Sequence, residues 1–325
     1  MSTTITVDGI TKRYGDHTAI DNLSFHVDSG TVFALLGTNG AGKTTTVEIL
    51  EGYRKPDSGN VRVLGQDPIA DSKDLRPRMG LMLQTSGIYP GAKAREIVHL
   101  FCSFYAHAKD PDELIELVGL TEASNVMFKR LSGGQQRRLS LAIALAGQPE
   151  VLFLDEPTAG MDPMARQTTY GIIRELKANG VTVVLTTHLL DEAEDLAEQV
   201  LILDRGRLVA CGTPADLMAG SESISFSGPP ALELATLPLS FTHTTEIRPG
   251  EYLTDTRSTP GALADLTNWA FHKNILLTHI RAGAKSLEEA FLHLVEETNP
   301  HTPSALLSLP EEEARAGETR SEVPL

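Results

Sequence analysis

Aromatic side chains are scarce in this sequence. They make up 5% of its 325 residues, and Trp269 is the single tryptophan. Proteins that bind single-stranded nucleic acid stack bases on several aromatic side chains, so this composition disfavours such a platform. The formal net charge of −15 also disfavours broad contact with nucleic-acid phosphates, although it leaves room for a small basic patch. We therefore expect no nucleic-acid partner.

Cysteines and long apolar runs are also few. Cys102 and Cys211 lie far apart and lack the spacing of a metal site, which predicts two buried, reduced thiols. No run reaches the roughly 18 apolar residues that a membrane helix needs. The first ten residues lack the basic start and apolar core of a signal peptide. The sequence thus predicts a soluble cytoplasmic protein that can reach a membrane only through a partner.

The first two thirds of the chain alternate strand and helix patterns. Period-2 alternation in TITVDGI and NVRVLG predicts half-buried antiparallel strands. The continuous apolar runs TVFALLG, VLFLD and VTVVLTT are typical of buried strands in a parallel sheet. Helical patterns follow them, including one from Pro163 to Asn179. We therefore predict an α/β fold with a doubly wound parallel-sheet core, an N-terminal antiparallel β subdomain and a helical insertion.

The pattern changes near Thr213-Pro214. From Ile224 to about Glu297 the sequence predicts a small α+β unit with the order strand, short helix, two strands, helix, strand and helix, and a ferredoxin-like arrangement is one candidate. Ser286 with Glu289 forms a capping box for its last helix. The segment from Thr298 onward is rich in Pro, Glu, Ser and Ala, which is typical of disorder. These changes divide the chain into an α/β domain at 1–216, an accessory α+β domain at 217–297 and an acidic tail at 298–325.

A phosphate-binding loop follows the first buried parallel strand. Residues 37–44 read GTNGAGKT, which satisfies G-x-x-x-x-G-K-[ST], and a helical pattern follows at once. Glycines let backbone N–H groups wrap a phosphate, and a helix N-terminus favours negative charge. We expect Lys43 to reach the β- and γ-phosphates and the Thr44 hydroxyl to bind Mg²⁺. The nucleotide-binding candidates of this loop are Gly37, Thr38, Asn39, Gly40, Ala41, Gly42, Lys43, Thr44 and Thr45.

Polar residues end three further strands. Asp155 closes VLFLD, at the sheet edge where ligands bind in open α/β folds, and is expected to complete the Mg²⁺ shell through water. Glu156 follows it, placed to polarise the water that attacks the γ-phosphate. A plain strand-capping role for this pair is the alternative, which the phosphate loop disfavours. His188 ends the next strand and could reach the same pocket, and Gln84 ends MGLMLQ.

A second turn with the residues of a phosphate-binding site occurs in the stretch LSGGQQRRLS. Ser132, Gly133 and Gly134 open a predicted helix there, a pattern that suits an anion at a helix N-terminus. One nucleotide pocket does not need two such turns. The stretch therefore points to a second phosphate contact somewhere else.

Taken together, these motifs resemble the nucleotide-binding subunit of an ABC transporter, a P-loop NTPase that binds ATP. They occur in the family's order, namely the phosphate loop, Gln84, the signature Leu131–Gln135, the run VLFLDE, the segment Ala159–Asp162 and His188. A phosphate loop alone would leave kinases and GTPases open, but the signature does not. Thr38, Ala159 and Met161 depart from the commoner residues of the family, yet none of these changes removes a ligand, base or signature donor. The resemblance therefore implies a competent ATPase.

The resemblance also implies roles that the residues alone do not. In this family two ATPase domains pack head to tail, so the signature of one chain contacts the γ-phosphate held by the other, and ATP joins the two. The residues concerned are Ser132, Gly133, Gly134 and Gln135. Further implied roles are adenine stacking for Tyr14, Mg²⁺ and water contact for Gln84, organisation of the interface for Asp162, and contact with the γ-phosphate and water for His188. For Tyr14, an ordinary strand-end tyrosine is the alternative.

The C-terminal third narrows the resemblance. The box SLEEAFLHLV, after RGRLVACGTPADL, looks like the drug- and antibiotic-export ATPases of the daunorubicin-resistance type. That group implies a homodimer coupled to a separate polytopic membrane subunit at the cytoplasmic face of the membrane. The alternative is a soluble ABC ATPase that acts on ribosomes or DNA, which the single copy of each motif, the lack of heptads and the acidic charge disfavour. The transported compound cannot be read from this chain, because in this family it binds the membrane subunit.

Overall fold

The computed structural model describes residues 2–82, 87–218, 222–241, 243–254, 256, 258–284 and 286–298. These residues divide into two compact units. The first runs to residue 218 and includes Ala284–Leu294, and the second comprises residues 222–283 with the end of the last helix from Val295. Among the described helices, none combines the length and the hydrophobicity that crossing a bilayer requires.

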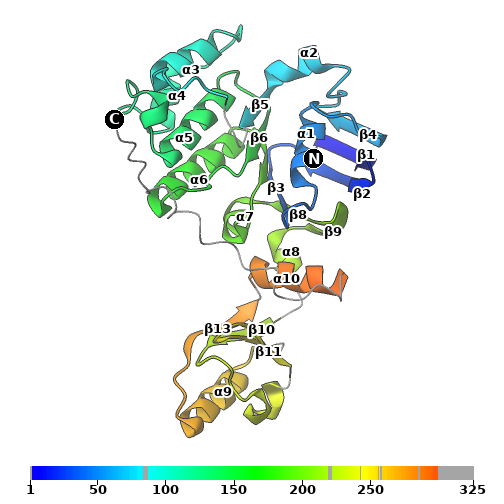
Figure 1. Ribbon diagram of the computed structural model, residues 1–325, viewed down its shortest axis with the longest axis vertical. Helices are drawn as coiled ribbons and strands as arrows, with labels where there is room; N and C mark the ends of the chain where they lie inside the picture. Colours follow the sequence, from blue (N-terminus) through cyan, green and yellow to red (C-terminus); the bar gives the residue numbers. More distant parts are fainter. Residues whose placement is uncertain are drawn as a thin grey trace, which may run out of the picture. The chain divides into compact units, whose positions relative to one another are not determined.

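A six-stranded sheet forms the centre of the first unit (Figure 1). Five neighbouring strands run parallel and the sixth, β9, pairs antiparallel with β8. Every residue of β7 is buried, as expected for a strand covered on both faces. This sheet confirms the predicted parallel α/β core. In spatial order its strands are β5 (Met79–Met82), β6 (Val151–Asp155), β7 (Thr182–Thr186), β3 (Val32–Gly37), β8 (Gln199–Asp204) and β9 (Arg207–Gly212).

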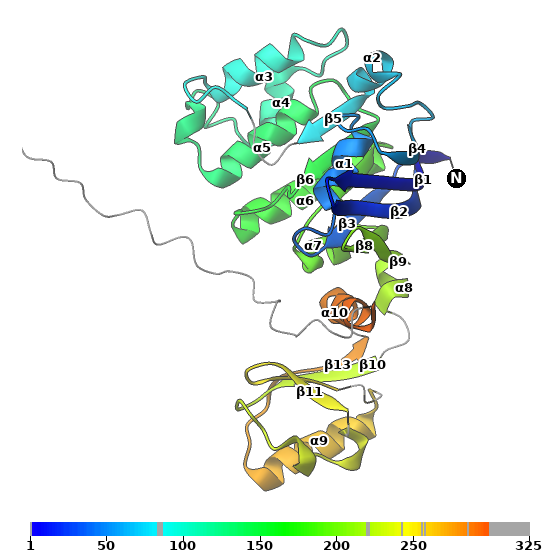
Figure 2. The ribbon, with the colours of Figure 1, turned by 45° about the vertical axis from the view of Figure 1, so that its right-hand side comes forward.

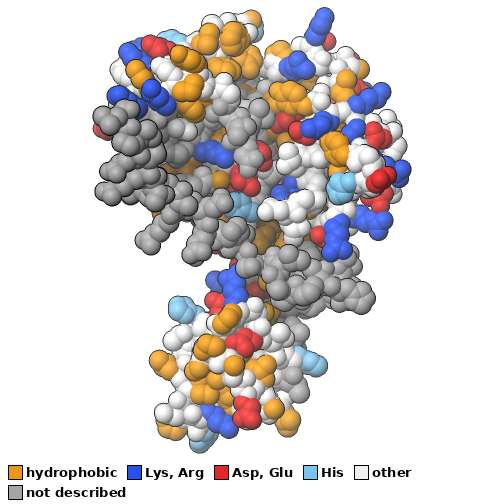
Figure 3. All heavy atoms as spheres, viewed as in Figure 1, with side chains coloured by type: hydrophobic (Ala, Val, Ile, Leu, Met, Phe, Trp, Pro, Cys, Tyr) orange, Lys and Arg blue, Asp and Glu red, His pale blue; other side chains and the backbone are white. Residues whose placement is uncertain are grey.

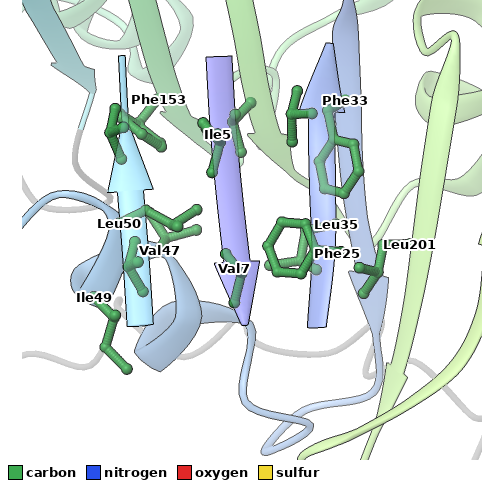
Figure 4. Packing of buried hydrophobic residues seen from close by; sticks show 14 of the residues in the cluster. Ile5, Val7, Phe25, Phe33, Leu35, Val47, Ile49, Leu50, Phe153 and Leu201 are labelled. Carbon is green, nitrogen blue, oxygen red and sulfur yellow. The ribbon is translucent and has the colours of Figure 1, made fainter. Parts of the chain in front are cut away.

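A smaller antiparallel sheet packs against this core. It has the order β2-β1-β4, with bounds β1 (Thr3–Tyr14), β2 (His17–Asp28) and β4 (Ser58–Val63). Ile5 and Val7 of β1 are buried, and their side chains meet Phe33 and Leu35 of β3 in one apolar cluster (Figure 4). Because successive side chains of a strand point to opposite faces, the period-2 pattern placed one face of this sheet on the core.

Helices flank the central sheet. Figures 1 and 2 both show α3, α4 and α5 together on the β5 side of the first unit, with the β2-β1-β4 sheet on the opposite side. This group is the predicted helical insertion. The helix predicted from Pro163 ends one residue earlier than expected, with Asn179 as its cap. The helices are α1 (Lys43–Leu50), α2 (Ser72–Leu75), α3 (Ala94–Cys102), α4 (Pro111–Leu117), α5 (Gly133–Ala144), α6 (Pro163–Ala178), α7 (Leu190–Leu196), α8 (Pro214–Met218) and α10 (Leu287–Thr298).

The second unit is a four-stranded sheet with helix α9 (Pro260–Lys273). The buried cluster of this unit consists of Ile224, Phe226, Phe241, Tyr252, Ala262 and Leu266. The strand order is β11-β12-β10-β13, with bounds β10 (Glu222–Ser227), β11 (Thr244–Arg248), β12 (Glu251–Thr254) and β13 (Thr278–Ala284). The sequence therefore placed the elements of this α+β unit in the right order.

The last helix belongs partly to the first unit. Residues 284–294 cluster with that unit, and the Leu287 N–H donates to Glu194 Oε2 on α7 at 3.3 Å. The predicted accessory domain at 217–297 had assigned this helix to the other unit. Its capping box forms as expected, with Ser286 N–H donating to Glu289 Oε2 at 2.9 Å. The predicted tail, apart from Thr298, lies outside the described residues.

One of the two cysteines differs from expectation. Cys102 is buried in α3, whereas Cys211 is exposed, and both are free thiols. Cys211 lies on β9, the edge strand of the six-stranded sheet, where a residue has a neighbouring strand on one side only. The prediction of two buried thiols was therefore wrong for Cys211.

Candidate functional site

The loop between β3 and α1 has a backbone that requires glycine. Gly42, which precedes α1, has a φ of +103°, in the left-handed region that L side chains rarely adopt. A Cβ atom at this position would lie 2.5 Å from the carbonyl oxygen of Ala19. The first turn of α1 follows Gly42 directly, and the free N–H groups of a first helical turn attract anions.

Lys43 lies inside this loop. Its Nζ donates to the carbonyl oxygens of Gly37 at 2.7 Å and Thr38 at 3.1 Å. Burial lowers the pKa of Lys43, and the negative charges of Glu156 and Asp155 oppose that shift. The ammonium group thus stands between the phosphate loop and two carboxylates.

A cavity of about 400 Å³ opens beside the loop. All but two of its lining residues, His17 and Ala19, were predicted from the sequence. Gly37 and Thr38 do not line it and instead hold Lys43 through their carbonyl groups. The cavity is lined by Tyr14, His17, Ala19, Asn39, Gly40, Ala41, Gly42, Lys43, Thr44, Thr45, Asp155 and Glu156.

Pairing of β6 with β7 brings the acidic residues to this cavity. Asp155 lies opposite Thr186 in the parallel ladder, and the Thr186 hydroxyl donates to Asp155 Oδ1. The Glu156 N–H donates to the Thr186 carbonyl at 3.0 Å. Glu156 itself has a φ of +48°, a conformation that costs about 1–3 kcal/mol for a non-glycine residue and persists only where surrounding contacts enforce it.

His188 reaches the same place from the segment after β7. Its Nδ1 lies 3.2 Å from Glu156 Oε1, and both side chains are partly exposed. His188 does not line the cavity, so it contacts the site through Glu156. The structure thus joins two residues that are 32 positions apart in the chain.

The oxygen donors at the cavity fit Mg²⁺. The Thr44 hydroxyl and the Asp155 carboxylate both line it. Mg²⁺ prefers one or two protein oxygens and completes its shell with substrate phosphates and water. Among the described residues, no three His, Cys, Asp or Glu side chains form a metal cluster.

Tyr14 stands at the rim of the cavity, at the end of β1. The residue is 40% exposed, and its side chain lines the cavity. The Arg54 guanidinium lies 5.4 Å from the ring centroid and Lys12 Nζ lies 5.8 Å from it. Arg54 in turn pairs with Glu48 on α1. Two cations within this range stabilise the ring and connect it to the helix of the phosphate loop.

The remaining predicted residues lie elsewhere. Ser132 caps α5 in a reciprocal box, in which its hydroxyl accepts from Gln135 N–H at 3.2 Å and Gln135 Oε1 accepts from Ser132 N–H at 2.9 Å. Asp162 caps α6 by accepting from Ala165 N–H at 2.9 Å. The signature residues Ser132, Gly133, Gly134 and Gln135 and the cap Asp162 do not line the cavity. Gln84 lies outside the described residues.

Sequence reasoning missed His17 and Ala19. The β1–β2 hairpin pairs Tyr14 with His17, and this pairing carries the first residues of β2 to the cavity beside Tyr14. The short turn Gly15-Asp16 between two strand patterns could have indicated it.

Comparison with known proteins places the chain among nucleotide-binding proteins. Residues 20–159 match the family model described as ABC transporter. The chain is 40% identical over 250 residues to the daunorubicin resistance ATP-binding protein DrrA3 of Streptomyces coeruleorubidus, covering 73% of this chain and 79% of that protein. It is 39% identical over 246 residues to the Nod factor export ATP-binding protein I of Burkholderia pseudomallei, covering 73% and 81%.

Solved structures agree on the fold. The ATP-binding subunit of an ABC transporter superposes with a TM-score of 0.61 at 27% identity, over 66% of this chain and 92% of that one. An ATP-binding cassette solved as a dimer in a post-hydrolysis state with ADP and Pi superposes with a TM-score of 0.59 at 25% identity, over 64% and 98%.

Proposed function

This chain belongs to the ABC transporter family as an ATPase subunit of the exporter type, and on that premise we propose that it drives drug or antibiotic efflux through a separate membrane subunit. Relatives named for daunorubicin resistance and for Nod factor export support the direction of transport. The observation that carries the assignment is a single cavity lined by the phosphate loop, Asp155 and Glu156.

Binding of ATP follows from the loop and its surroundings. The backbone N–H groups around Gly40 and Gly42 and the start of α1 would bind the phosphates, and Lys43 would turn from its carbonyl partners to the β- and γ-phosphates. Tyr14 would stack on the adenine. Thr44 and Asp155 would hold Mg²⁺, with Gln84 as a further contact; the ion neutralises the phosphate charge when bound.

Hydrolysis is assigned to Glu156. Its carboxylate lines the cavity next to the phosphate loop, where it would orient a water and accept its proton as the water oxygen bonds to the γ-phosphorus and the bond to the ADP oxygen breaks. His188, 3.2 Å from Glu156, would hold this carboxylate and contact the γ-phosphate. Asp155 accepts a hydrogen bond from the Thr186 hydroxyl, and in this proposal it binds the metal ion and does not act as the base.

The signature residues serve a second copy of the chain in this proposal. Ser132 and Gly133 are exposed, and the free N–H groups at the start of α5 can approach a phosphate closely. Head-to-tail dimerisation would place them, with Gln135, on the ATP of the other subunit, with Asp162 organising the interface. ATP then holds the dimer closed, and hydrolysis releases it.

A membrane subunit would dock on the helical side of the first unit. Tyr89, Leu100 and Phe104 are 76%, 55% and 67% exposed, and hydrophobic side chains gather over the α3 region in Figure 3. Exposed apolar groups of this size favour a protein contact. On the same face, basic and acidic side chains are interspersed (Figure 3), which does not favour nucleic acid. The chain would thus act at the cytoplasmic face of the membrane, bound through this partner.

Two variants test the catalytic assignment. We expect Lys43→Ala to lose ATP binding, because the loop loses the ammonium group that meets the phosphates. Glu156→Gln should bind ATP normally but hydrolyse it at least about 100-fold more slowly, since the amide cannot accept the proton. ATP binding and phosphate release are the measurements, and Glu175→Gln, an exposed change on α6, is the control. Rapid turnover by Glu156→Gln would remove its role as the base.

The partner is tested by affinity isolation. Tagged Glu156→Gln protein would be purified with ATP from gently solubilised membranes of its native host and its companions identified by mass spectrometry. A polytopic membrane protein in near-equal amount is the expected result. Ribosomal or DNA-associated proteins without such a partner would contradict the exporter and favour a soluble ABC ATPase.

A further inference from the structure

Two segments are linked in register at the carboxyl ends of β6 and β7. The first is Asp155–Thr158 and the second is Thr186–Glu192. Asp155 and the Glu156 N–H both bond to Thr186, and the Glu156 carboxylate meets His188 at 3.2 Å. The contacts at this end hold the two residues to which we assign hydrolysis.

A further contact closes the other end. The Thr158 hydroxyl donates to Glu192 Oε1 at 2.8 Å. Thr158 is 0% exposed and Glu192 is 1% exposed. Glu192 does not line the cavity, so it does not touch the nucleotide site. It lies four residues after His188, in the first turn of α7.

Glu192 is a buried acid that has no role in the hydrolysis mechanism proposed above. Burial raises its pKa, and the hydroxyls of Thr187 and Thr158 and the charges of Arg166 and His188 oppose that shift. From α6, the charge of Glu192 helps to raise the pKa of Tyr170 to about 12, after the larger effect of burial. Burying a carboxyl group costs free energy unless it is well hydrogen-bonded, so its position between three segments calls for a role.

The backbone of Glu156 supplies the reason for such a role. Its φ of +48° is unfavourable for a residue with a side chain and persists only where surrounding contacts enforce it. Thr186 provides the contact before the turn. Beyond the turn, Thr158 is held by Glu192 on the helix that follows His188. A shift of α7 would therefore move both Glu156 and His188.

We propose that Glu192 is a positioning residue for ATP hydrolysis, which holds Glu156 and His188 in register through its hydrogen bond to Thr158. The proposal rests on the catalytic role proposed for Glu156. It predicts an effect on the rate of hydrolysis that is separate from ATP binding. It also predicts that Glu192 and Thr158 act as one unit.

The test compares substitutions on both sides of the hydrogen bond. Glu192→Leu removes the acceptor and should lower kcat about 10- to 100-fold, the range expected when a reacting group shifts slightly, with the ATP Kd unchanged. Glu192→Gln keeps an oxygen that can accept from Thr158 and should restore kcat to within about threefold of the unmodified chain. Asp191→Asn, an exposed neighbour, is the control and should leave both constants unchanged.

Thr158→Val removes the donor of the same hydrogen bond. It therefore tests the proposal independently, even if Glu192→Leu does not fold. It should lower kcat to the same extent, and the Thr158→Val/Glu192→Leu pair should show no further loss, because two changes that break one contact are not additive. Either folded single variant with kcat within twofold of the unmodified chain, or additive losses in the pair, would overturn the proposal.

The parallel measurement on Glu156→Gln separates the two levels of inference. If Glu156→Gln hydrolyses ATP rapidly, the catalytic assignment fails, and the positioning role fails with it. If Glu156→Gln is inactive while Glu192→Leu and Thr158→Val are fully active, only the positioning role is overturned.

Discussion

Burial strongly raises the pKa of one acidic residue near the site, Glu51. It follows α1 and is 6% exposed. Burial raises its pKa from 4.5 to about 8, with smaller contributions from the charges of Asp155 and Glu48. The folded chain therefore binds a proton at Glu51 more tightly than the unfolded chain does.

This shift predicts a pH-dependent stability. Below pH 4.5 Glu51 is protonated in both the folded and the unfolded state, so its titration does not change the free energy of unfolding. Between pH 4.5 and about 8 the unfolded state releases this proton while the folded state retains it, which progressively favours the unfolded state. Stability from this group thus falls as the pH rises and levels off above 8. We expect Glu51→Gln to raise the free energy of unfolding above pH 8 on the order of a few kcal/mol, with little effect near pH 4.5.

Thermal unfolding of the unliganded chain over this pH range is the measurement. Glu116→Gln removes an exposed glutamate of α4 and serves as the control, with a flat difference expected. If the stability difference between Glu51→Gln and the unmodified chain did not grow with pH, the raised pKa of Glu51 would be contradicted.

At the scale of elements, the junction of β3 and α1 depends on its glycine. Gly42 combines a φ of +103° with a space already occupied by the Ala19 carbonyl. Gly171, in contrast, lies inside α6, and nothing lies within 4 Å of where its Cβ would be. The same chemical change is therefore expected to have opposite consequences at the loop position Gly42 and at the helical position Gly171.

We expect Gly42→Ala to lower the free energy of unfolding by about 1–3 kcal/mol and to weaken ATP binding, because the added Cβ displaces the loop. Gly171→Ala should raise it by about 0.5–1 kcal/mol, since alanine restricts the unfolded chain and favours the helix. Chemical denaturation and ATP titration of both variants check this pair. Equal effects of the two changes would contradict the conformational assignment of Gly42.

At the scale of the whole molecule, the position of the signature bears on assembly. Ser132 is an exposed cap of α5, outside the cavity of its own chain. An arginine there would place bulk and charge where the second subunit's ATP is proposed to bind. In a Glu156→Gln background, we expect Ser132→Arg to retain ATP binding by the monomer and to abolish the ATP-dependent dimer, as measured by light scattering after size-exclusion chromatography.

A matched variant separates this effect from the loss of the helix cap. Ser132→Ala removes the hydroxyl at a cost of about 1 kcal/mol to the helix but adds no bulk, so dimers should still form with reduced affinity. Unaltered dimerisation of the Ser132→Arg chain would refute the proposed contact across the interface.

The sequence alone determined the core fold and most of the cavity. Short stretches of the sequence were enough to predict the buried strands and the phosphate loop followed later by Asp155-Glu156. A strand in the middle of a parallel sheet must be apolar on both faces, and a phosphate loop needs glycine at fixed spacing. These patterns predicted the sheet, the loop and most residues that line the cavity. Local periodicity also predicted the elements of the second unit in their order.

The tertiary structure decided which distant residues meet. His17 joins the cavity because a hairpin pairs it with Tyr14, and Cys211 is exposed on β9, an edge strand in which no residue is buried. Glu192 faces Thr158 only because β6 and β7 are neighbours in the sheet. The assignment of residues 284–294 to the first unit has the same origin. Such contacts arise from strand order and burial, which a periodic pattern along one segment does not encode.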